Sequence, residues 1–440
     1  MKNIALTQLA VYNEPEVINL DNEQVIRLLN TNLTKTMGCT DIGVVGYIAS
    51  IGAYILRNEK IQTVSLLMSE ELYKNSVNVG VPGLKKSGLN SALALGILLK
   101  NPKQQLSVFE SVTNDDIEKI ELLLSEIKVS IKYKKFEHTV LYEELTITSV
   151  EGNSATIIIE DSYDNVVSVT RNNEILEDYE KSALMGRINP YKIANYDEIL
   201  TFVNKGDFTG LEYLFQTADL QYDNAREEIK KEDGNYLVED LREAQKECFY
   251  DLSNFLRKHI TVPSRKRMAG EIYTVYGVAG SGNLGIGTLI TPVFLSHALS
   301  LSTDVKHKII VLSFLTSVYV KQEMNIVTVL CGTGHATGCS AAAVTAFVKG
   351  ASDTQIKEAV NLYLATSMGF VCDGAKLSCT HKVSFAAMNG MIAGKMVLDH
   401  ENTCDGTGLN KVDLDKTIKN LGKLNNEILN SANKGIIELI

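Results

Sequence analysis

Two long segments without any charged side chain place the tightest constraint on how this chain folds. They run from Ile272 to Thr303 and from Met324 to Val348. About 20 apolar residues suffice to cross a bilayer, but both segments are rich in Gly, Ser, Thr and Asn, and each holds a histidine. We therefore predict central, fully buried helices and loops rather than membrane spans.

Charge and composition restrict the partners of the chain. Charged residues make up 22% and hydrophobic residues 45%, which is ordinary for a soluble globular protein. The formal net charge is −10 and no basic tract stands out, which argues against nucleic acid and anionic membranes as partners. The N-terminus meets acidic residues before any long apolar run and does not resemble a signal peptide. We expect a cytoplasmic protein that acts on a small molecule, and leave open whether it forms a homo-oligomer.

We expect the cysteines of this chain to be reduced thiols rather than disulfides. Seven of them, an odd number in a long chain without a secretion signal, argue against a disulfide framework. Buried packing, catalysis and metal binding are the remaining roles. The cysteines are Cys39, Cys248, Cys331, Cys339, Cys372, Cys379 and Cys404.

The pattern of hydrophobic residues changes twice along the chain. Residues 1–59 read as helical, with Asn22 capping EQVIRLLNTNLTKT and a buried helix in VVGYIASIGAYIL. Residues 60–172 contain five β-rich segments and two helices, GLNSALALGILL and NDDIEKIELLLSEI. Residues 173–440 return to helix. We predict an α+β fold: a mainly helical catalytic domain from 1–59 and 173–440, with a small α+β domain, 60–172, inserted into it.

Four cysteines are concentrated in two loop-like segments. Cys331 and Cys339 lie in LCGTGHATGCSAAA, and Cys372 and Cys379 lie in GFVCDGAKLSCTHK. Iron–sulfur clusters need several thiolates from Gly-bearing backbone. Zinc sites usually bring cysteines in pairs two to four residues apart, and these segments contain no such pair. Spacing alone leaves a cluster and buried structural cysteines as alternatives.

The segment GSGNLG, from Gly280 to Gly285, matches the dinucleotide fingerprint, with Asp304 near the position of a ribose-binding acid. No second strand before Asp304 supports that interpretation. Glycine-rich backbone at a helix start also offers N–H groups to a small anion such as a substrate carboxylate. Tight packing of a loop between helices is the structural alternative.

Two shorter motifs carry candidate functional groups. Lys74 and Asn75 precede a turn made rigid by Pro82, and Lys74 is placed to hold a carboxylate or to be solvated. Cys39, in TMGCTD, comes just before a predicted helix, where the helix dipole lowers the pKa of a thiol. Cys39 is therefore a candidate base or ligand, with unreactive packing as the alternative.

Together these segments resemble the L-cysteine desulfidase family, relatives of the iron–sulfur L-serine dehydratase alpha chain. The resemblance covers nearly the whole chain and includes GCT, KN followed by VPG, GSGNLGIG, the Cys331 segment and CDGAKLSC. It departs from the family at Ile42, where a proline is common, and at Leu284, where a polar residue is common. The chain ends NKGIIELI, without the terminal cysteine that caps the cluster in the serine dehydratases.

The resemblance implies a role for each motif. Cys331, Cys372 and Cys379 are expected to ligate a [4Fe–4S] cluster, with Cys339 as the rival of Cys331. Cys39 is expected to act close to the substrate Cα. Our own hypothesis is that Cys39 is the base there, with a role as cluster ligand still open. The substrate-binding residues are expected to be Lys74, Asn75, Gly280, Ser281, Gly282, Asn283 and Gly285.

The function that follows is an L-cysteine desulfidase that needs no pyridoxal phosphate. It would convert L-cysteine to pyruvate, ammonia and hydrogen sulfide, with an open iron acting as Lewis acid on the leaving sulfur. An L-serine dehydratase with the same cluster chemistry is the first alternative. A non-enzymatic iron–sulfur redox sensor is the second, and a nucleotide-dependent oxidoreductase based on GSGNLG is the third.

Overall fold

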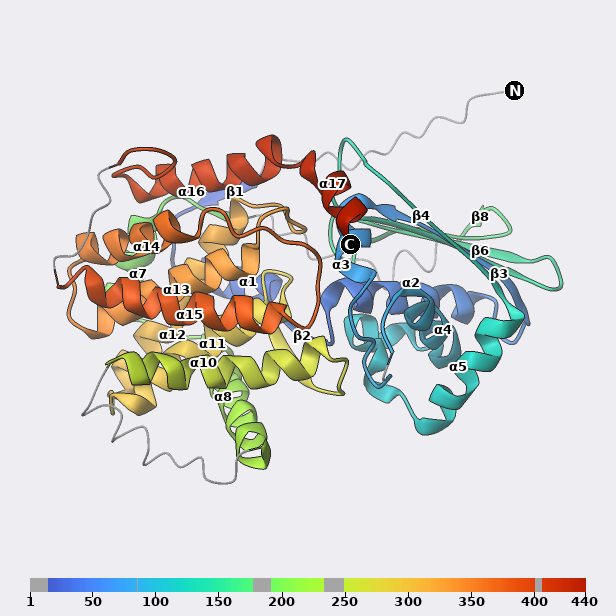
Figure 1. Cartoon of the computed structure of the whole chain (residues 1–440), viewed down its shortest axis with the longest axis horizontal. Helices are drawn as coiled ribbons and strands as arrows, with labels where there is room; N and C mark the ends of the chain where they lie inside the picture. The colour runs from blue at the N-terminus through green and yellow to red at the C-terminus, as the bar shows by residue number, and fades with distance from the viewer. Residues whose placement is uncertain (1–14, 85, 177–190, 233–248, 400–405) are drawn as a thin grey trace.

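A bundle of helices and a smaller unit built on a β-sheet lie side by side in the computed structural model (Figure 1). The structure describes residues 15–84, 86–176, 191–232, 249–399 and 406–440. Cys248 and Cys404 lie outside these described residues. The predicted α+β class, mostly helical, is confirmed.

The sheet of the smaller unit has six strands in the order β4-β3-β5-β6-β7-β8. Only β3 and β4 pair in parallel, and the other pairs are antiparallel. Buried and half-buried residues alternate along β5 and β6, as expected for a sheet with one covered face. The five predicted β-rich segments correspond to β3 (Ile61–Ser69), β4 (Lys128–Lys134), β5 (Tyr142–Ser149), β6 (Ser154–Glu160) and β7 (Val166–Arg171), followed by the short β8 (Glu174–Ile175).

Helix α2 (Thr40–Ile55) packs on β5 and β6, and α4 (Leu89–Leu99) packs on α2. Helix α2 is apolar on nearly every side, so it needs a partner on more than one face. The sheet covers one face and α4 covers another. Its residues belong to the same hydrophobic cluster as those of the sheet. The division of the chain at residues 59 and 172 stays a prediction. The unit also contains α3 (Glu70–Ser76), the 3₁₀ segment η1 (Pro102–Ser111) and α5 (Asn114–Glu126).

The uncharged segments form the two central helices of the bundle, α11 (Gly282–Ala298) and α13 (Gly332–Val348). Nearly all of their residues are buried, so the prediction of central, buried segments is confirmed. No helix in the described ranges is both long and apolar enough to cross a membrane. Around them lie α7 (Tyr196–Lys205), α8 (Glu212–Glu232), α10 (Phe249–Met268), α12 (Thr303–Gln322), α14 (Asp353–Ser367), α15 (Cys379–Met396) and α16 (Leu414–Lys423).

The N-terminal segment differs from the prediction in two respects. Helix α1 (Asn22–Asn32) is capped by Asp21 rather than Asn22, because the Asp21 Oδ1 accepts a hydrogen bond from Gln24 N at 2.8 Å. The expected helix then gives way to a strand, β2 (Leu33–Met37), which pairs antiparallel with β10 (Thr274–Val278). The threonines of this segment favour a strand once a partner is present. A second small sheet joins β1 (Glu16–Ile18) and β9 (Tyr191–Ile193) in parallel.

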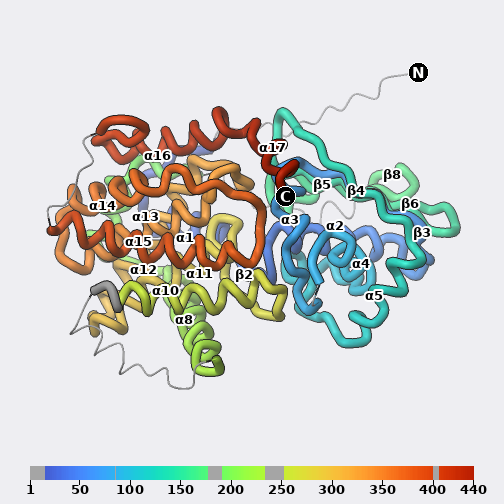
Figure 2. Tube along the Cα trace, in the orientation of Figure 1, coloured from blue at the N-terminus to red at the C-terminus, as the bar shows by residue number. Residues whose placement is uncertain are grey.

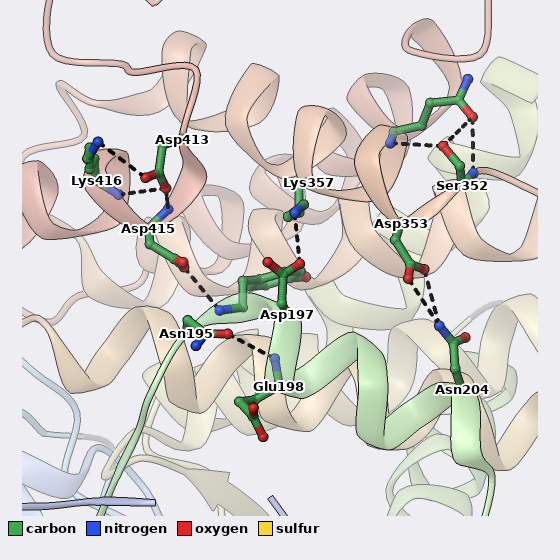
Figure 3. Close-up of polar contacts among 12 residues, drawn as sticks. Asn195, Asp197, Glu198, Asn204, Ser352, Asp353, Lys357, Asp413, Asp415 and Lys416 are labelled. Atoms are coloured by element: carbon green, nitrogen blue, oxygen red, sulfur yellow. Dashed lines mark hydrogen bonds and ion pairs between the residues drawn. The ribbon is translucent and has the colours of Figure 1, made fainter. Parts of the chain in front are cut away.

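Polar contacts fasten α7 to two later helices of the bundle (Figure 3). Asp197 makes an ion pair with Lys357 of α14 at 2.7 Å, and Asn204 donates to Asp353 at 3.2 Å. The backbone N–H of Tyr196 donates to Asp415 of α16 at 3.0 Å. Helix α7 is thereby anchored to two helices of the C-terminal half of the bundle.

The C-terminal helix α17 (Ala432–Leu439) contacts α3 of the sheet unit, where Figure 2 also places the C-terminus. Asn433 is fully buried and donates to Glu71 at 3.2 Å. Lys74 donates to Asn433 Oδ1 at 2.8 Å. The end of the chain therefore closes over the helix that carries Lys74 and Asn75.

Candidate active site

A cavity of about 110 Å³ lies between the sheet unit and the bundle. The start of α2, the end of α3, the end of α10, the loop before α11 and the starts of α13 and α15 all contribute to its wall. The polar and sulfur-bearing side chains in this wall are Cys39, Thr40, Asp41, Asn75, Tyr163, Arg267, Met268, Ser281, Asn283, Lys321, Thr328, Cys331, Thr333, Cys372 and Cys379. Residues from across the sequence are thus brought to one small space.

Backbone hydrogen bonds bring Cys331 and Cys372 to this cavity. The Cys331 N–H donates to Phe370 O at 2.6 Å, and the Cys372 N–H donates to Val329 O at 2.7 Å. Cys331 is the N-cap of α13, and its Sγ accepts from Gly334 N at 3.4 Å. Cys379 is the first residue of α15. The two segments predicted from sequence to supply thiols therefore meet.

The three thiols affect one another electrostatically. Burial, and then the charge of Cys372, raise the pKa of Cys331 to about 12. Burial also raises the pKa of Cys379, and the charge of Cys372 adds to the effect. Three thiolates in such a place require positive charge between them, and an iron–sulfur cluster supplies it.

The same donor set does not suit a single metal ion. Within the described ranges, no three His, Cys, Asp or Glu side chains are grouped to hold one ion. A single zinc ion needs its thiolates about 2.3 Å away, whereas a cluster takes separated thiolates on different irons. A soft, all-thiol set around a cavity is compatible with the cluster.

Cys339 lies elsewhere. The segment that we predicted as a loop from Cys331 onward is helix α13, and Cys339 lies within it, fully buried in the core of the bundle. It is not among the residues that line the cavity. Burial raises the pKa of its thiol. Its surroundings are those of a packing residue.

Cys39 reaches the cavity from the N-cap position of α2. We expected the helix dipole to lower the pKa of this thiol, and the structure corrects that expectation. Burial and the negative charge of Asp41 raise the pKa of Cys39 well above its ordinary value, while the positive charge of Arg267 opposes them. Desolvation of a group that is 5% exposed outweighs the dipole.

Asp41 is the hydrogen-bonding partner of Cys39. The Cys39 thiol donates to Asp41 Oδ2 at 3.2 Å. The other oxygen, Oδ1, accepts from the Tyr163 hydroxyl at 2.9 Å and from Asn75 Nδ2 at 3.4 Å. Asp41 is thereby held in one orientation, with one oxygen directed at the sulfur.

The glycine-rich loop precedes a helix, as predicted. Gly280, Ser281, Gly282 and Asn283 line the cavity, and Ser281 caps α11 by accepting from Leu284 N. The Ser281 hydroxyl also lies 2.9 Å from the hydroxyl of Thr333, which ties the loop to the start of α13.

The dinucleotide interpretation of this loop is not supported. The strand before the loop, β10, pairs antiparallel with β2, and Asp304 lies in the first turn of α12. A dinucleotide site needs a parallel βαβ unit with the acid after the second strand. Within the described residues, the chain has no such strand after α11.

Two predicted substrate-binding residues do not line the cavity. The Lys74 ammonium is buried and donates to Thr328 O at 2.9 Å and to Asn433 Oδ1, so it supports the wall from behind. Gly285 faces β10, where an added Cβ would lie 1.9 Å from Tyr276 O. It allows α11 and β10 to approach closely. Asn75, the neighbour of Lys74, does line the cavity.

Two cations in the wall escaped sequence reasoning. Arg267 lies in the run SRKRM, which looks like an exposed, basic end of a helix, yet it is 2% exposed. Lys321 ends an otherwise apolar stretch of α12, and burial lowers its pKa to about 8. Its Nζ donates to Asn325 O at 3.0 Å. A single cation in an apolar stretch was the one available signal for Lys321.

A larger cavity of about 260 Å³ adjoins the first. Tyr163, Gly280, Lys321 and Ile326 line both cavities. Because the two spaces share these walls, a small molecule in the larger cavity lies next to the cysteine-lined one.

Comparison with known proteins gives a consistent result. The family model for the serine dehydratase alpha chain matches residues 103–438. A UPF0597 protein of Fervidobacterium nodosum is 27% identical over 416 residues, covering 93% of this chain and 94% of the relative. A UPF0597 protein of Caldanaerobacter subterraneus is 27% identical over 424 residues, covering 94% and 97%. One of Phocaeicola vulgatus is 26% identical over 423 residues, covering 96% and 97%.

Proposed function

Because this chain belongs to the serine dehydratase alpha chain family, we propose that it is an iron–sulfur lyase that eliminates sulfide from L-cysteine. The observation that carries the proposal is the shared cavity. One space of about 110 Å³ is lined by three cysteines that suit a cluster, by Cys39 and by the glycine-rich loop. Its size suits a small amino acid.

Cys331, Cys372 and Cys379 would hold a [4Fe–4S] cluster. When bound, such a cluster supplies an open iron, a Lewis acid that makes the substrate sulfur a better leaving group. Cys339, buried within α13, is the poorer candidate for a ligand. The ammonium groups of Lys74 and Lys321 lie near enough to the thiolates of Cys331 and Cys372 to be affected by their charge, and would balance part of it.

Cys39 would remove the proton from the substrate Cα. Asp41 Oδ2, which already accepts the hydrogen bond of the thiol, would take the proton of Cys39 and leave a thiolate. The positive charge of Arg267 assists because it lowers the pKa of Cys39. A role for Cys39 as a fourth cluster ligand is the alternative.

The loop Gly280–Asn283 and Asn75 would orient the substrate. The residues at the start of α11 and Asn75 line the cavity. Backbone N–H groups of a helix start, and a side-chain amide, are groups that can donate to a carboxylate. Fixing the carboxylate holds Cα against the base, which is a major part of catalysis in a site of this size.

The reaction then balances without pyridoxal phosphate. The electron pair of the Cα–H bond forms the Cα–Cβ double bond, and the C–S bond breaks with its electrons on sulfur. Aminoacrylate leaves and hydrolyses in water to pyruvate and ammonia. An L-serine dehydratase would run the same steps with hydroxide as leaving group, and the family's name favours it as second candidate.

Three cysteine variants and one control test the cluster assignment. Anaerobically prepared Cys331→Ala, Cys372→Ala and Cys379→Ala should each lose iron, acid-labile sulfide and turnover. Cys339→Ala, the matched control in α13, should retain all three. Loss of iron in the control, with full iron in Cys331→Ala, would contradict the assignment. A colourless wild type without turnover of L-cysteine or L-serine would contradict the proposed function.

A further inference from the structure

Arg267 is a buried cation in the wall of the candidate active site. It lies in the last turn of α10, is 2% exposed and lines the cavity. Its Nη1 donates to Asn283 Oδ1 at 2.7 Å, and its Nη2 donates to Gly38 O. Both acceptors are neutral.

No carboxylate of the described residues makes an ion pair with this guanidinium. The nearby carboxylate, Asp41, directs its oxygens at Cys39, Tyr163 and Asn75 instead. The buried Nε–H of Arg267 has no hydrogen-bond acceptor. A buried charge that lacks both a counter-ion and one acceptor is costly unless a ligand supplies them.

The position of the guanidinium is tightly fixed. Gly282 lies directly against it, since a Cβ added there would be 2.4 Å from Arg267 Cζ and 2.7 Å from Nε. The charges of Cys39, Asp41 and Cys379 all act on Arg267, although Asp41 makes no hydrogen bond or ion pair with it. The guanidinium therefore lies within electrostatic range of the proposed base and of a proposed cluster ligand.

We propose that Arg267 binds the carboxylate of the substrate, and that the site consequently selects amino acids with a free carboxylate. This inference rests on the proposed function and adds its specificity-determining residue. A guanidinium pairs with a carboxylate through charge-assisted hydrogen bonds in fixed geometry. Lys74, the cation expected from sequence, already donates to Thr328 and Asn433.

The test uses two ligands of nearly equal shape, 3-mercaptopropionate and its neutral amide. Neither carries the α-amino group of a substrate, so binding is measured without turnover. Calorimetry on the anaerobic, cluster-loaded protein should show that wild type prefers the carboxylate by about 10- to 100-fold, the range of a charged hydrogen bond. Arg267→Gln should lose this preference. Arg265→Gln, on the exposed side of the same helix, should keep it.

Iron content and melting temperature establish that each variant is folded and loaded. Equal affinity of wild type for the two ligands would overturn the assignment, as would an unchanged preference in a loaded Arg267→Gln. If Arg267→Gln does not fold, Arg267→Lys replaces it: a reduced preference supports the assignment, and an unchanged preference overturns it. Because binding is read without catalysis, a wild type that prefers the carboxylate but releases no sulfide would refute the proposed function alone.

Discussion

Gly282→Ala is the substitution that tests the site most sharply without removing any functional group. The new Cβ would lie 2.4 Å from Arg267 Cζ and 2.5 Å from Nη2, whereas carbon atoms in contact keep about 3.5 Å. The guanidinium must therefore move by roughly 1 Å, the difference between these distances. Because Arg267 lines the cavity, the displaced group would encroach on the space proposed for the substrate.

The displacement should affect both stability and function. A shift of roughly 1 Å takes Nη1 beyond hydrogen-bonding range of Asn283 Oδ1, now 2.7 Å away. Loss of that bond should lower the free energy of unfolding by about 1.5–3 kcal/mol. Misplacing the substrate by a similar amount should lower kcat/KM for L-cysteine by about 10²-fold.

The assay is sulfide release from L-cysteine by anaerobic protein, with iron content measured on the same sample. Gly369→Ala is the control, because an added Cβ there meets nothing within 4 Å. It should behave as wild type. Wild-type kcat/KM in a cluster-loaded Gly282→Ala would refute the reasoning, since the guanidinium would then have no part in placing the substrate.

Three further predictions concern other groups. Cys39→Ser should keep the cluster absorption and lose about 10²- to 10⁴-fold in kcat, and a changed cluster spectrum would instead identify Cys39 as a ligand. Asn433→Ala should lower the free energy of unfolding in urea by about 1–3 kcal/mol, because buried Lys74 and Glu71 each lose a partner; unchanged unfolding would refute that link. Burial and the charge of Asp41 raise the pKa of Glu143, whose two carboxyl oxygens have no partner. Because the pKa of Glu143 is higher in the folded than in the unfolded state, its protonation stabilises the fold below the unfolded-state pKa, and this stabilisation is lost as pH rises through the folded-state pKa. Glu143→Gln should therefore show a smaller fall in melting temperature than wild type between pH 5 and pH 9. An equal fall in both proteins would contradict this.

Local pattern was sufficient for much of the fold. The alternation of β5 and β6 and the apolar character of α2 and α11 identify these elements, because each is defined by which of its own side chains are buried. β2 was missed because its partner, β10, lies far along the chain. Glycines and cysteines obscure the helical pattern of α13, so the sequence of this segment reads as a loop.

The part of the candidate site that consists of recognisable sequence motifs could be predicted from the sequence. Cys331, Cys372, Cys379 and the loop from Gly280 to Asn283 do line one cavity. Cavity lining alone does not establish their chemical roles, which stay proposals.

Non-local contacts were beyond reach of the sequence. Lys74 finds its partner Asn433 at the other end of the chain, and the pKa of Cys39 depends on burial and on Arg267. The burial of Arg267 itself depends on how α10 meets the loops at Gly38 and Gly282. Such facts follow from tertiary packing, which no local pattern encodes.

The measurement that tests the central claim most directly is product formation by anaerobically purified wild type given L-cysteine. Sulfide, pyruvate and ammonia should appear in equal amounts, from protein that carries a full cluster and no pyridoxal phosphate. The rate should exceed that of pyruvate formation from L-serine under the same conditions. Faster turnover of L-serine would identify a dehydratase. Absence of all three products from a cluster-loaded protein, with either amino acid, would contradict the account.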